Sequence, residues 1–427
     1  MTAPAAVLVT LRLLLGVGIG QFACAAAPVS APGLTPERIV LNPTAEPATS
    51  IAVTWRTAIA GGSASVQWAE STPGTTFKAR AVTLPARTET VRLDASEQVY
   101  YHAAVLHGLK PASAYLYRVG SDQGWSEWNQ FTTAAAAPAP FTFVYLGDPQ
   151  DDLTEHVTRV FRAADLHAPD AAFWLIAGDL TSEPEDAQVR DLFAAAGFAF
   201  RTRALFPVVG NHDLAFVYEN GRIAINARGK KVRAKAPPPA WRAQFSLPEN
   251  GPRGLEELCY HVDYQGLRVI VLNTNDRLAE QAAWMEPLLA RNPHRWTIVA
   301  FHHPVYSAGR ERDDRETRDA FLPLFDRYQV DLVLTGHDHA YARTHPLRGG
   351  ATVPAGVRGT VYVVSSSGPK FYTVNAQYAG IMAKLAGDRQ LFQTIAIDGP
   401  TLRYTSIAAN GELNDRFEIV KPPRSQP

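Results

Sequence analysis

Side chains that can bind metal ions recur at the ends of five apolar runs in this sequence. The runs are FVYLGD with Asp148, FWLIAGD with Asp179, FPVVGNHD with Asn211 and His212, TIVAFHHP with His302 and His303, and DLVLTGHDH with His337 and His339. Carboxylate oxygen, amide oxygen and imidazole nitrogen are ligands that Zn, Mn and Fe accept. The chain has only 2 cysteines, too few for a thiolate site. The donor types therefore favour a centre of two divalent or trivalent ions, Fe, Zn or Mn.

Each of these runs is typical of a buried strand, and stretches of helical character separate them. Asp148, Asp179 and Asn211 follow one another at 31 and 32 residues, which matches successive strand and helix units of about 30 residues. In open α/β sheets ligands collect at the carboxyl ends of strands, so we expect the five run ends to meet in one crevice. Glycine before the ligands permits a sharp turn and leaves room for an ion. A carboxylate such as Asp179 can bridge two ions that together clamp a phosphoryl group during its transfer.

The chain has 427 residues, a length typical of two or three domains. Residues 34–133 consist of short alternating runs separated by turns, which predicts an all-β sandwich similar to a fibronectin type III module, with Trp55 in its core. A proline-containing connection leads to an α/β domain over residues 140–427, with two sheets flanked by helices. We therefore expect a multidomain fold, an N-terminal all-β sandwich followed by an α/β domain.

The charges of the chain balance, because 41 Lys and Arg residues face 41 Asp and Glu residues. No overall field gathers nucleic acid or an anionic membrane, so neither is expected as a partner, and any recognition of phosphate must be local. The segment 222–250 is basic at 229–235 and then carries three consecutive prolines. We expect a long loop there, either simply solvated or acting as a basic gate for an anionic substrate.

The first 27 residues are apolar and end in small residues, which predicts a cleaved signal peptide. The mature protein is then expected to be secreted or periplasmic, with no membrane span. A short membrane anchor is one alternative. A lipoprotein attached at Cys24 is less favoured, because the residues before Cys24 make a poor lipidation box. After cleavage only Cys259 remains, so no internal disulfide can form.

The motifs GDPQ, GDL, GNHD, HHP and GHDHAYAR, in this order, resemble those of the calcineurin-like metallophosphoesterases, and with the β module in front the chain looks most like the purple acid phosphatases. The resemblance implies an acid phosphatase-like, metal-dependent hydrolase of small phosphate monoesters, with a metal-bound hydroxide as nucleophile. The implied ligands are Asp148, Asp179 and His339 for one ion, and Asp179, Asn211, His302 and His337 for the other. His212 is the implied catalytic residue, which stabilises the transition state or donates a proton.

Three positions depart from that resemblance. Ser182 stands where purple acid phosphatases have a tyrosine, so the tyrosinate-to-iron absorption is expected to be absent. Gln150 stands where many non-purple relatives have histidine, and we expect it to lie beside the ligands, although its amide oxygen can also ligate or orient a water. Glu311 and Arg312 replace a histidine pair of plant-type relatives, so substrate contacts cannot be transferred there.

The remaining residues of the motifs are interpreted as supports. His303, Asp213 and Asp338 are expected to pack beside or orient the ligands. For Tyr341 and Arg343 a structural role and a phosphate contact are equally open. Two other functions remain as alternatives, a phosphodiesterase of the same superfamily and a binding or adhesion protein built on an idle metal fold.

Overall fold

The computed structural model describes residues 33–422 except for 94–96, 227, 228, 230, 310 and 376. The predicted signal peptide at 1–27 and the alternative lipidation site at Cys24 therefore lie outside the described residues. Within the described part of the chain, no helix combines the length and the apolar character that crossing a bilayer requires.

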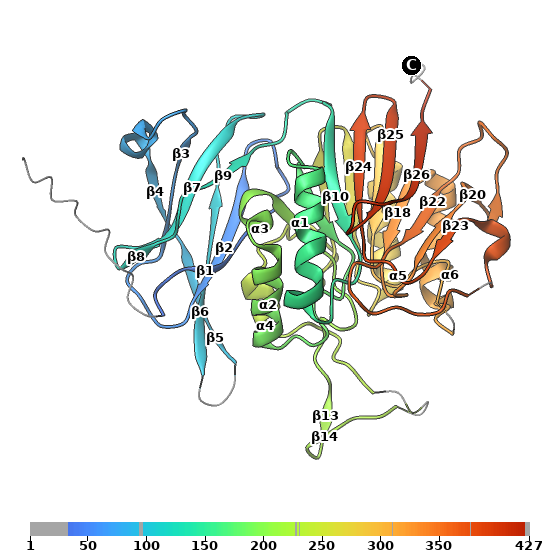
Figure 1. Cartoon of the computed structure of the whole chain (residues 1–427), viewed down its shortest axis with the longest axis horizontal. Helices are drawn as coiled ribbons and strands as arrows, with labels where there is room; N and C mark the ends of the chain where they lie inside the picture. The colour runs from blue at the N-terminus through green and yellow to red at the C-terminus, as the bar shows by residue number, and fades with distance from the viewer. Residues whose placement is uncertain are drawn as a thin grey trace, which may run out of the picture.

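Two antiparallel sheets form the N-terminal domain (Figure 1). One has the order β1-β2-β6-β5, with β1 (Glu37–Asn42), β2 (Ile51–Thr57), β6 (Gln98–Leu106) and β5 (Arg87–Arg92). The other comprises β4 (Val82–Pro85), β3 (Ser65–Glu70), β7 (Ala114–Ser121), β8 (Gly124–Trp125) and β9 (Asn129–Thr132), with the short η1 (Thr76–Arg80) before β4. Trp55 is fully buried in a cluster that joins the two sheets, as expected for a sandwich.

The second domain begins with a six-stranded sheet of order β12-β11-β10-β24-β25-β26. Its strands are β12 (Ala204–Pro207), β11 (Phe173–Ile176), β10 (Phe141–Leu146), β24 (Leu391–Asp398), β25 (Thr401–Ala408) and β26 (Leu413–Val420). The strands β10, β11 and β12 run parallel, and the others are antiparallel. All four residues of β11 are buried, which is typical of parallel strands covered on both faces.

A seven-stranded sheet of order β15-β16-β17-β18-β22-β19-β23 packs against the first. Its strands are β15 (Tyr260–Tyr264), β16 (Leu267–Val271), β17 (Trp296–Ala300), β18 (Leu332–Thr335), β22 (Val361–Val364), β19 (Tyr341–Thr344) and β23 (Met382–Ala386). Here β16, β17, β18 and β22 are parallel. A hairpin of β20 (Leu347–Arg348) and β21 (Ala351–Thr352) and the short η3 (Ala379–Ile381) lie outside the sheet.

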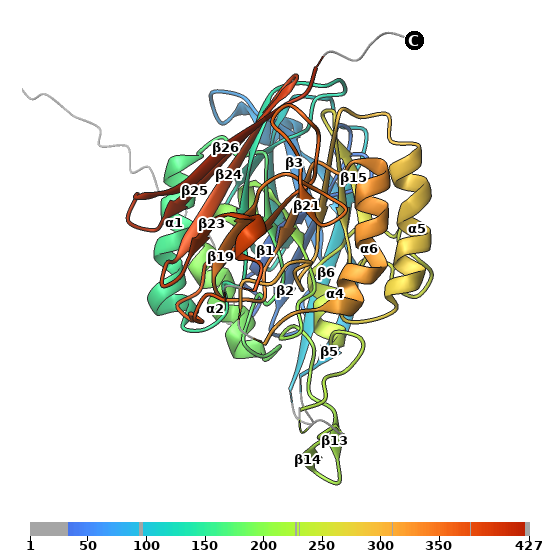
Figure 2. The same cartoon turned by 90° about the vertical axis from the view of Figure 1, so that its right-hand side faces the viewer.

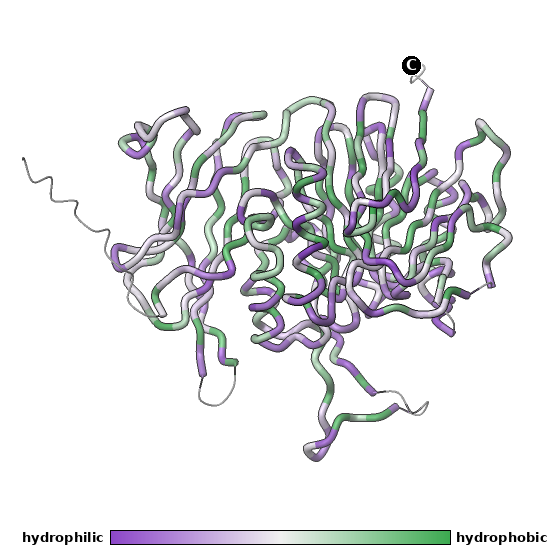
Figure 3. Tube along the Cα trace, in the orientation of Figure 1, coloured by the Kyte–Doolittle hydropathy of each residue, from purple (hydrophilic) through white to green (hydrophobic). Residues whose placement is uncertain are grey.

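Helices cover the outer faces of the two sheets, as Figure 2 shows. They are the short η2 (Leu153–Val157) with α1 (Thr158–His167), α2 (Asp186–Ala196), α3 (Ala199–Thr202), α5 (Leu278–Ala290) and α6 (Arg315–Tyr328). The main core joins α1 and both sheets, and a second core joins the seven-stranded sheet to α5 and α6. Figure 3 shows the hydrophobic residues gathered along the interior strands. The expected fold class, a β sandwich followed by a two-sheet α/β domain with flanking helices, is confirmed.

The two domains are joined by buried polar contacts. Asp186, the first residue of α2, pairs with Arg38 at 2.7 Å and with Arg56 at 2.5 Å. Gln244 is the last residue of α4 (Pro239–Gln244). Its side-chain amide donates to the backbone carbonyl of Arg38 at 3.0 Å, and its backbone carbonyl accepts from the Thr54 hydroxyl. These contacts hold the sandwich against the side of the α/β domain that carries α2 and α4.

We expected one long loop over the segment 222–250. The structure corrects this expectation, because the segment contains the strand β14 and the helix α4. Its first residues form β14 (Arg222–Ile223), which pairs with β13 (Tyr218–Glu219) in a hairpin that projects from the body of the molecule (Figures 1 and 2). The hairpin continues toward the body, because Val217 donates to the Val232 carbonyl at 2.9 Å. Beyond it the triple proline leads into α4, where Pro239 suits the first turn of a helix because it needs no amide hydrogen there.

Candidate metal centre

Three parallel strands of the six-stranded sheet deliver oxygen donors to one place. Asp148 follows β10, Asp179 follows β11 and Asn211 follows β12, and we call these three residues the oxygen half. The backbone N–H of His337 donates to Asp148 Oδ2 at 2.6 Å, and the N–H of His212 donates to Asp179 Oδ1 at 2.7 Å. Both carboxylates are buried and are held by backbone donors as well as by their own strands.

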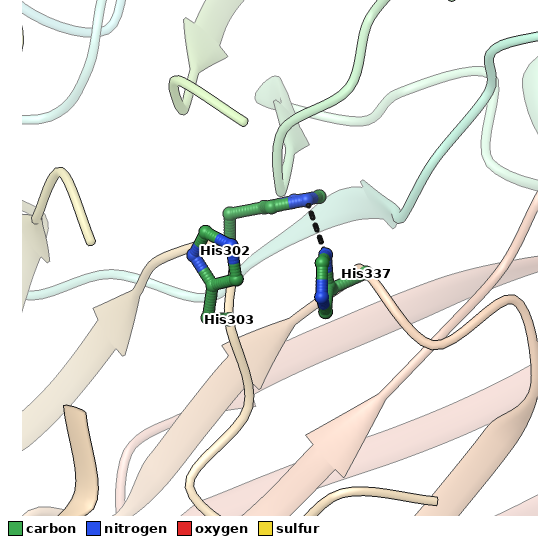
Figure 4. Close-up of side chains that lie close together, drawn as sticks. All are labelled: His302, His303 and His337. Carbon is green, nitrogen blue, oxygen red and sulfur yellow. Dashed lines mark hydrogen bonds between the residues drawn. The ribbon is translucent and has the colours of Figure 1, made fainter. Parts of the chain in front are cut away.

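Strands β17 and β18 of the other sheet deliver imidazoles to the same place, His302 after β17 and His337 and His339 after β18. We call these three residues the nitrogen half. His302 Nε2 lies 3.2 Å from Asp179 Oδ2, 3.2 Å from Asn211 Oδ1 and 3.1 Å from His337 Nδ1. Figure 4 shows His302 and His337 side by side with a hydrogen bond between them. The two halves therefore meet around one point.

His339 completes the nitrogen half through Gln150. The Gln150 amide nitrogen lies 3.0 Å from His339 Nε2 and 3.2 Å from Asp179 Oδ2. Gln150 is fully buried, and its Oε1 has no hydrogen-bond partner among the described residues. Gln150 thus lies between two candidate ligands, in the position that the sequence indicated.

The backbone at the centre adopts conformations that L-residues seldom take. Asp148, Asp179, His337 and His339 have φ angles of 44°, 51°, 76° and 48°. Such left-handed conformations cost free energy in non-glycine residues and gather at functional sites. A Cβ on Gly210 would lie 2.2 Å from both Asp179 N and Asp179 Oδ1, so only glycine allows this close approach.

Two aspartates next to the candidate ligands fix the surrounding backbone, as expected. Asp213 accepts hydrogen bonds from the N–H groups of Asp179, Leu180 and Gly210 at 2.7 to 3.0 Å. Asp338 accepts from the Ser307 hydroxyl and from the two N–H groups that follow Ser307. Both carboxyl oxygens of Asp213 and the Oδ2 of Asp338 are therefore occupied by these backbone and hydroxyl donors.

Tyr341 and Arg343 also prove structural. Both bond to the buried Asp415, Tyr341 through its hydroxyl at 2.8 Å and Arg343 through Nε at 2.6 Å. These contacts tie β19 to β26 across the two sheets and favour the structural role for Tyr341 and Arg343.

The local charges shift the pKa values of the candidate ligands in different directions. Burial opposes ionisation of Asp179, but the neighbouring His302 outweighs it and lowers the pKa of Asp179. Burial alone would lower the pKa of His302, yet the Asp179 carboxylate raises it to about 9. Burial lowers the pKa of His339 to about 3 and that of His337 well below its usual value. His337 and His339 are therefore neutral and keep a lone pair to donate.

The donor set fits bound cations. Burial raises the pKa of Asp148 well above its usual range, and the nearby Asp179 carboxylate adds to the rise. Asp148 Oδ1 and His339 Nδ1 are buried without a hydrogen-bond partner among the described residues. The ligand atoms of Asp148, Asp179 and His302 lie within 4.8 Å of one another. Buried polar atoms without partners cost free energy, and a cation bound by the Asp148 oxygen would remove part of that cost.

The ring of His303 lies directly beside the candidate ligands His302 and His337. Its ring centroid is 4.3 Å from that of His337, and it forms with His302 and His337 a second group of potential ligands. Thr274, three residues after β16, bonds through its hydroxyl both to the ring Nδ1 of His303 at 2.8 Å and to the backbone N–H of His303 at 3.1 Å. The ring is thereby held beside the ligands, as expected for an orienting residue.

The predicted catalytic residue His212 is anchored at the edge of the centre. Its Nδ1 lies 2.6 Å from the Ser182 carbonyl and 3.0 Å from Arg233 Nη2. Arg233 in turn pairs with Glu183 at 2.9 Å. The Ser182 hydroxyl bonds to Asp151, so its short side chain is already engaged.

Thr274, Arg233 and Arg312 surround the predicted site residues, and the sequence did not assign any of them to the site. Arg312 Nη2 lies 2.8 Å from His337 Nε2. Thr274 lies within the run VIVLNTN, whose polar end follows a strand in the same way as the ligand motifs do, and this signal could have found it. Arg233 belongs to the basic run 229–235 and Arg312 to a position noted as departing from the resemblance, but the sequence did not place either side chain beside a histidine of the centre.

Comparison with known proteins defines the class. Residues 141–341 match the family model of the calcineurin-like phosphoesterases, and residues 36–133 match the model of the purple acid phosphatase N-terminal domain. The fold agrees with this class of metallophosphoesterase. The chain combines a purple acid phosphatase N-terminal domain with a calcineurin-like phosphoesterase domain, which confirms the resemblance that the motifs indicated.

Relatives and solved structures agree with this class. The chain is 26% identical over 380 residues to mouse acid phosphatase type 7, covering 79% of this chain and 78% of the relative. It is 27% identical over 384 residues to an uncharacterized protein of Mycobacterium tuberculosis, covering 77% of this chain and 68% of the relative. The structure of the purple acid phosphatase PPD1 from yellow lupin seeds matches with a TM-score of 0.75 at 20% identity, over 91% of this chain and 75% of that one. At that identity the structural match shows the shared fold.

Proposed function

We propose that this protein is a two-metal phosphatase that hydrolyses small phosphate monoesters. The observation that carries the proposal is the convergence of the oxygen half and the nitrogen half from two different sheets, with unpartnered buried acceptors between them among the described residues. The similarity to acid phosphatase type 7 of mouse supports the same reaction.

The residues present suit two cations. We assign the ligands as the resemblance implies: Asp148, Asp179 and His339 for one ion, and Asp179, Asn211, His302 and His337 for the other. Ions bound there would activate water and neutralise the charge that develops on the phosphoryl oxygens. Fe, Zn and Mn all accept this donor set, and a curated relative in Arabidopsis thaliana is named an Fe(3+)-Zn(2+) purple acid phosphatase.

The protein itself holds the shared carboxylate of Asp179 in place and provides His212 as a group that can carry a proton. Asp179 is held by the backbone N–H of His212, so any movement of His212 is transmitted to the shared carboxylate. The His212 ring donates from Nδ1 to the Ser182 carbonyl at 2.6 Å. That bond leaves the ring Nε2 to hydrogen-bond to the phosphate or, when both ring nitrogens carry a proton, to give one to the leaving group, which is the role we assign to His212.

The proposal is tested with metal analysis and two esters. We expect the purified protein, reconstituted with Fe, Zn or Mn, to hold about two ions per chain and to turn over p-nitrophenyl phosphate faster than bis(p-nitrophenyl) phosphate. Fewer than one ion per chain together with no turnover would overturn the proposal. Faster turnover of the diester would show the alternative reaction, phosphodiester hydrolysis.

Export stays a prediction, because residues 1–27 lie outside the described residues. We propose that the mature enzyme acts in the periplasm or outside the cell. N-terminal sequencing of the protein recovered from these fractions tests this directly, since cleavage near Ala27 is expected. An intact N-terminus in the membrane fraction would instead show an anchor.

A further inference from the structure

Three short segments form an arm that projects from the body of the molecule (Figures 1 and 2). We call them the projecting arm, and they comprise residues 216–219, 222–226 and 231–233. Each segment bonds to the other two. The N–H groups of Ala224 and Val232 donate to the carbonyls of Val217 and Ala224 at 2.8 Å, and the Val217 N–H donates to the Val232 carbonyl at 2.9 Å. The arm therefore satisfies these backbone groups within itself.

The apolar side chains of the projecting arm have no core behind them. Tyr218 is 64% exposed and Ile225 is 57% exposed. Val217, Ile223 and Val232 are partly exposed. In the part of the chain that the structure describes, none of the hydrophobic clusters includes a residue of the arm. Burial of these side chains against a partner would therefore be favourable.

The same arm carries more cations than anions. Arg222, Lys231 and Arg233 accompany one acidic residue, Glu219. Arg233 pairs with Glu183 at the base of the arm, whereas Arg222 and Lys231 form no ion pair among the described residues. The arm thus presents unneutralised positive charge beside exposed apolar side chains.

We propose that the projecting arm docks the protein on the surface of an anionic phospholipid bilayer. The side chains of Tyr218 and Ile225 would enter the boundary between headgroups and acyl chains, while Arg222 and Lys231 would lie among the lipid phosphates. Tyrosine suits that boundary, because its ring is apolar and its hydroxyl reaches water. The balanced charge of the whole chain argued against a membrane partner, but it excludes only long-range attraction, and this contact is local.

A second copy of the chain would suit the arm less well. A stable protein interface takes about 20 to 30 residues from each partner, more than the described arm contains. The centre of such an interface is also poor in charged residues, whereas cations flank the apolar residues of the arm. A bilayer accepts a narrow projection, and its anionic headgroups neutralise the cations around the inserted side chains.

The test measures vesicle binding by the mature chain without residues 1–27, so that the predicted signal peptide cannot itself bind lipid. Vesicles of phosphatidylglycerol and phosphatidylcholine in equal parts are compared with vesicles of phosphatidylcholine alone, by co-sedimentation in about 0.1 M NaCl. Y218S/I225S removes the two most exposed apolar side chains of the arm. R222Q/K231Q removes its two unpaired cations.

Two matched controls lie outside the arm. L166S/L413S exchanges two leucines that are 80% and 51% exposed, in α1 and β26. K78Q/R80Q removes two exposed cations of η1. All four variants should keep the thermal stability of the wild-type protein, because the exchanged side chains are exposed.

We expect the wild-type protein to bind the vesicles that contain phosphatidylglycerol, more weakly as the salt concentration rises, and not to bind pure phosphatidylcholine. Y218S/I225S should bind about 10- to 100-fold more weakly, because two apolar side chains no longer leave water. R222Q/K231Q should bind about 10- to 30-fold more weakly, because it loses the attraction to the lipid phosphates. Both controls should match the wild-type protein.

Other results would overturn the proposal. Absence of wild-type binding to the anionic vesicles is one, and equal binding by Y218S/I225S and the wild-type protein is another. A wild-type dimer that becomes a monomer in Y218S/I225S, seen by sedimentation velocity, would show that a second copy covers the arm instead. If Y218S/I225S fails to fold, R222Q/K231Q and its control decide. The inference is independent of the proposed function, because none of these measurements involves phosphate hydrolysis.

Discussion

The oxygen half and the nitrogen half of the candidate centre are held in different ways. Backbone N–H groups fix the oxygen half, because His337 N donates to Asp148 and His212 N donates to Asp179. Side chains and carbonyl groups fix the nitrogen half, where the Ala177 carbonyl accepts from His302 Nδ1 at 2.9 Å and Arg312 donates to His337. Several of these bonds cross from one half to the other.

The difference separates a rigid part of the site from an adaptable one. A backbone donor cannot turn away without moving its strand, so the carboxylates keep their places whether or not ions are bound. An imidazole can move its proton between two nitrogens while its ring stays still. We infer that the oxygen half sets the geometry of the centre, and that the nitrogen half adjusts its hydrogen bonds to the ions.

The largest expected effect follows from replacing the carboxylate that the two assigned ions share. Asp179→Asn removes the charge from the residue that lies close to both His302 and Gln150. We expect the variant to lose both ions and its phosphatase rate to fall by more than about 100-fold. This exceeds the effect of replacing a residue that only hydrogen-bonds to a metal ligand. Metal analysis and p-nitrophenyl phosphate kinetics measure this. Retention of two ions would show that Asp179 is not shared.

A smaller loss is expected from the nitrogen half. His337→Ala removes a ligand assigned to one ion only, so the variant should keep about one ion per chain while activity falls by about 100-fold or more. The ratio of ions to protein separates this result from that of Asp179→Asn. Equal ion loss in the two variants would contradict the division into a shared oxygen half and an adaptable nitrogen half.

Because the oxygen half is rigid, we expect that a larger side chain next to Asp179 destabilises the fold. In Gly210→Ala the new Cβ would meet the Asp179 backbone, so we expect a loss of about 1 to 3 kcal/mol in the free energy of unfolding. Gly62→Ala is the control, because no described atom outside its chain neighbours lies within 4 Å of the place where its Cβ would stand, and it should change stability by less than about 0.5 kcal/mol. Urea unfolding measures both. A neutral Gly210→Ala would show that the oxygen half can move.

Asp148 and His303 should respond to pH with opposite signs in chelator-treated protein. Burial lowers the pKa of His303, which lies beside the nitrogen half, to about 3, so between pH 6.5 and 3 the unfolded chain binds a proton that the folded chain does not, and acid destabilises. Burial raises the pKa of Asp148, so stability falls instead as the pH rises above about 4.

Urea unfolding from pH 4.5 to 8 tests this pair of slopes. On acidification His303→Gln should lose less stability than the wild-type protein, by about 2 to 3 kcal/mol. As the pH rises, Asp148→Asn should lose less stability than the wild-type protein. Added metal ions should abolish the alkaline loss in the wild-type protein, because a cation stabilises the ionised carboxylate. Parallel pH profiles for the two variants would contradict the assignment.

The sequence was enough to predict which residues gather at the centre, because apolar runs mark parallel strands and their carboxyl ends meet. It could not show that Arg312 faces His337 or that Arg233 faces His212, since those contacts depend on how separate segments pack. The segment 222–250 was predicted as a loop from its basic and proline-rich composition. The backbone pairing of its first part with β13 has no alternating pattern that would have revealed it. The tyrosinate absorption expected to be absent because of Ser182 stays a prediction.

The left-handed backbone at Asp148, Asp179, His337 and His339 implies a conflict between durability and catalysis. Asparagine or glycine would occupy these four positions with less conformational cost, of order 1 kcal/mol at each. Selection of variants for heat resistance alone should therefore favour exchanging the very residues that hold the cations. A laboratory evolution experiment without a demand for turnover is expected to erase this centre early and to leave the surrounding sheets intact.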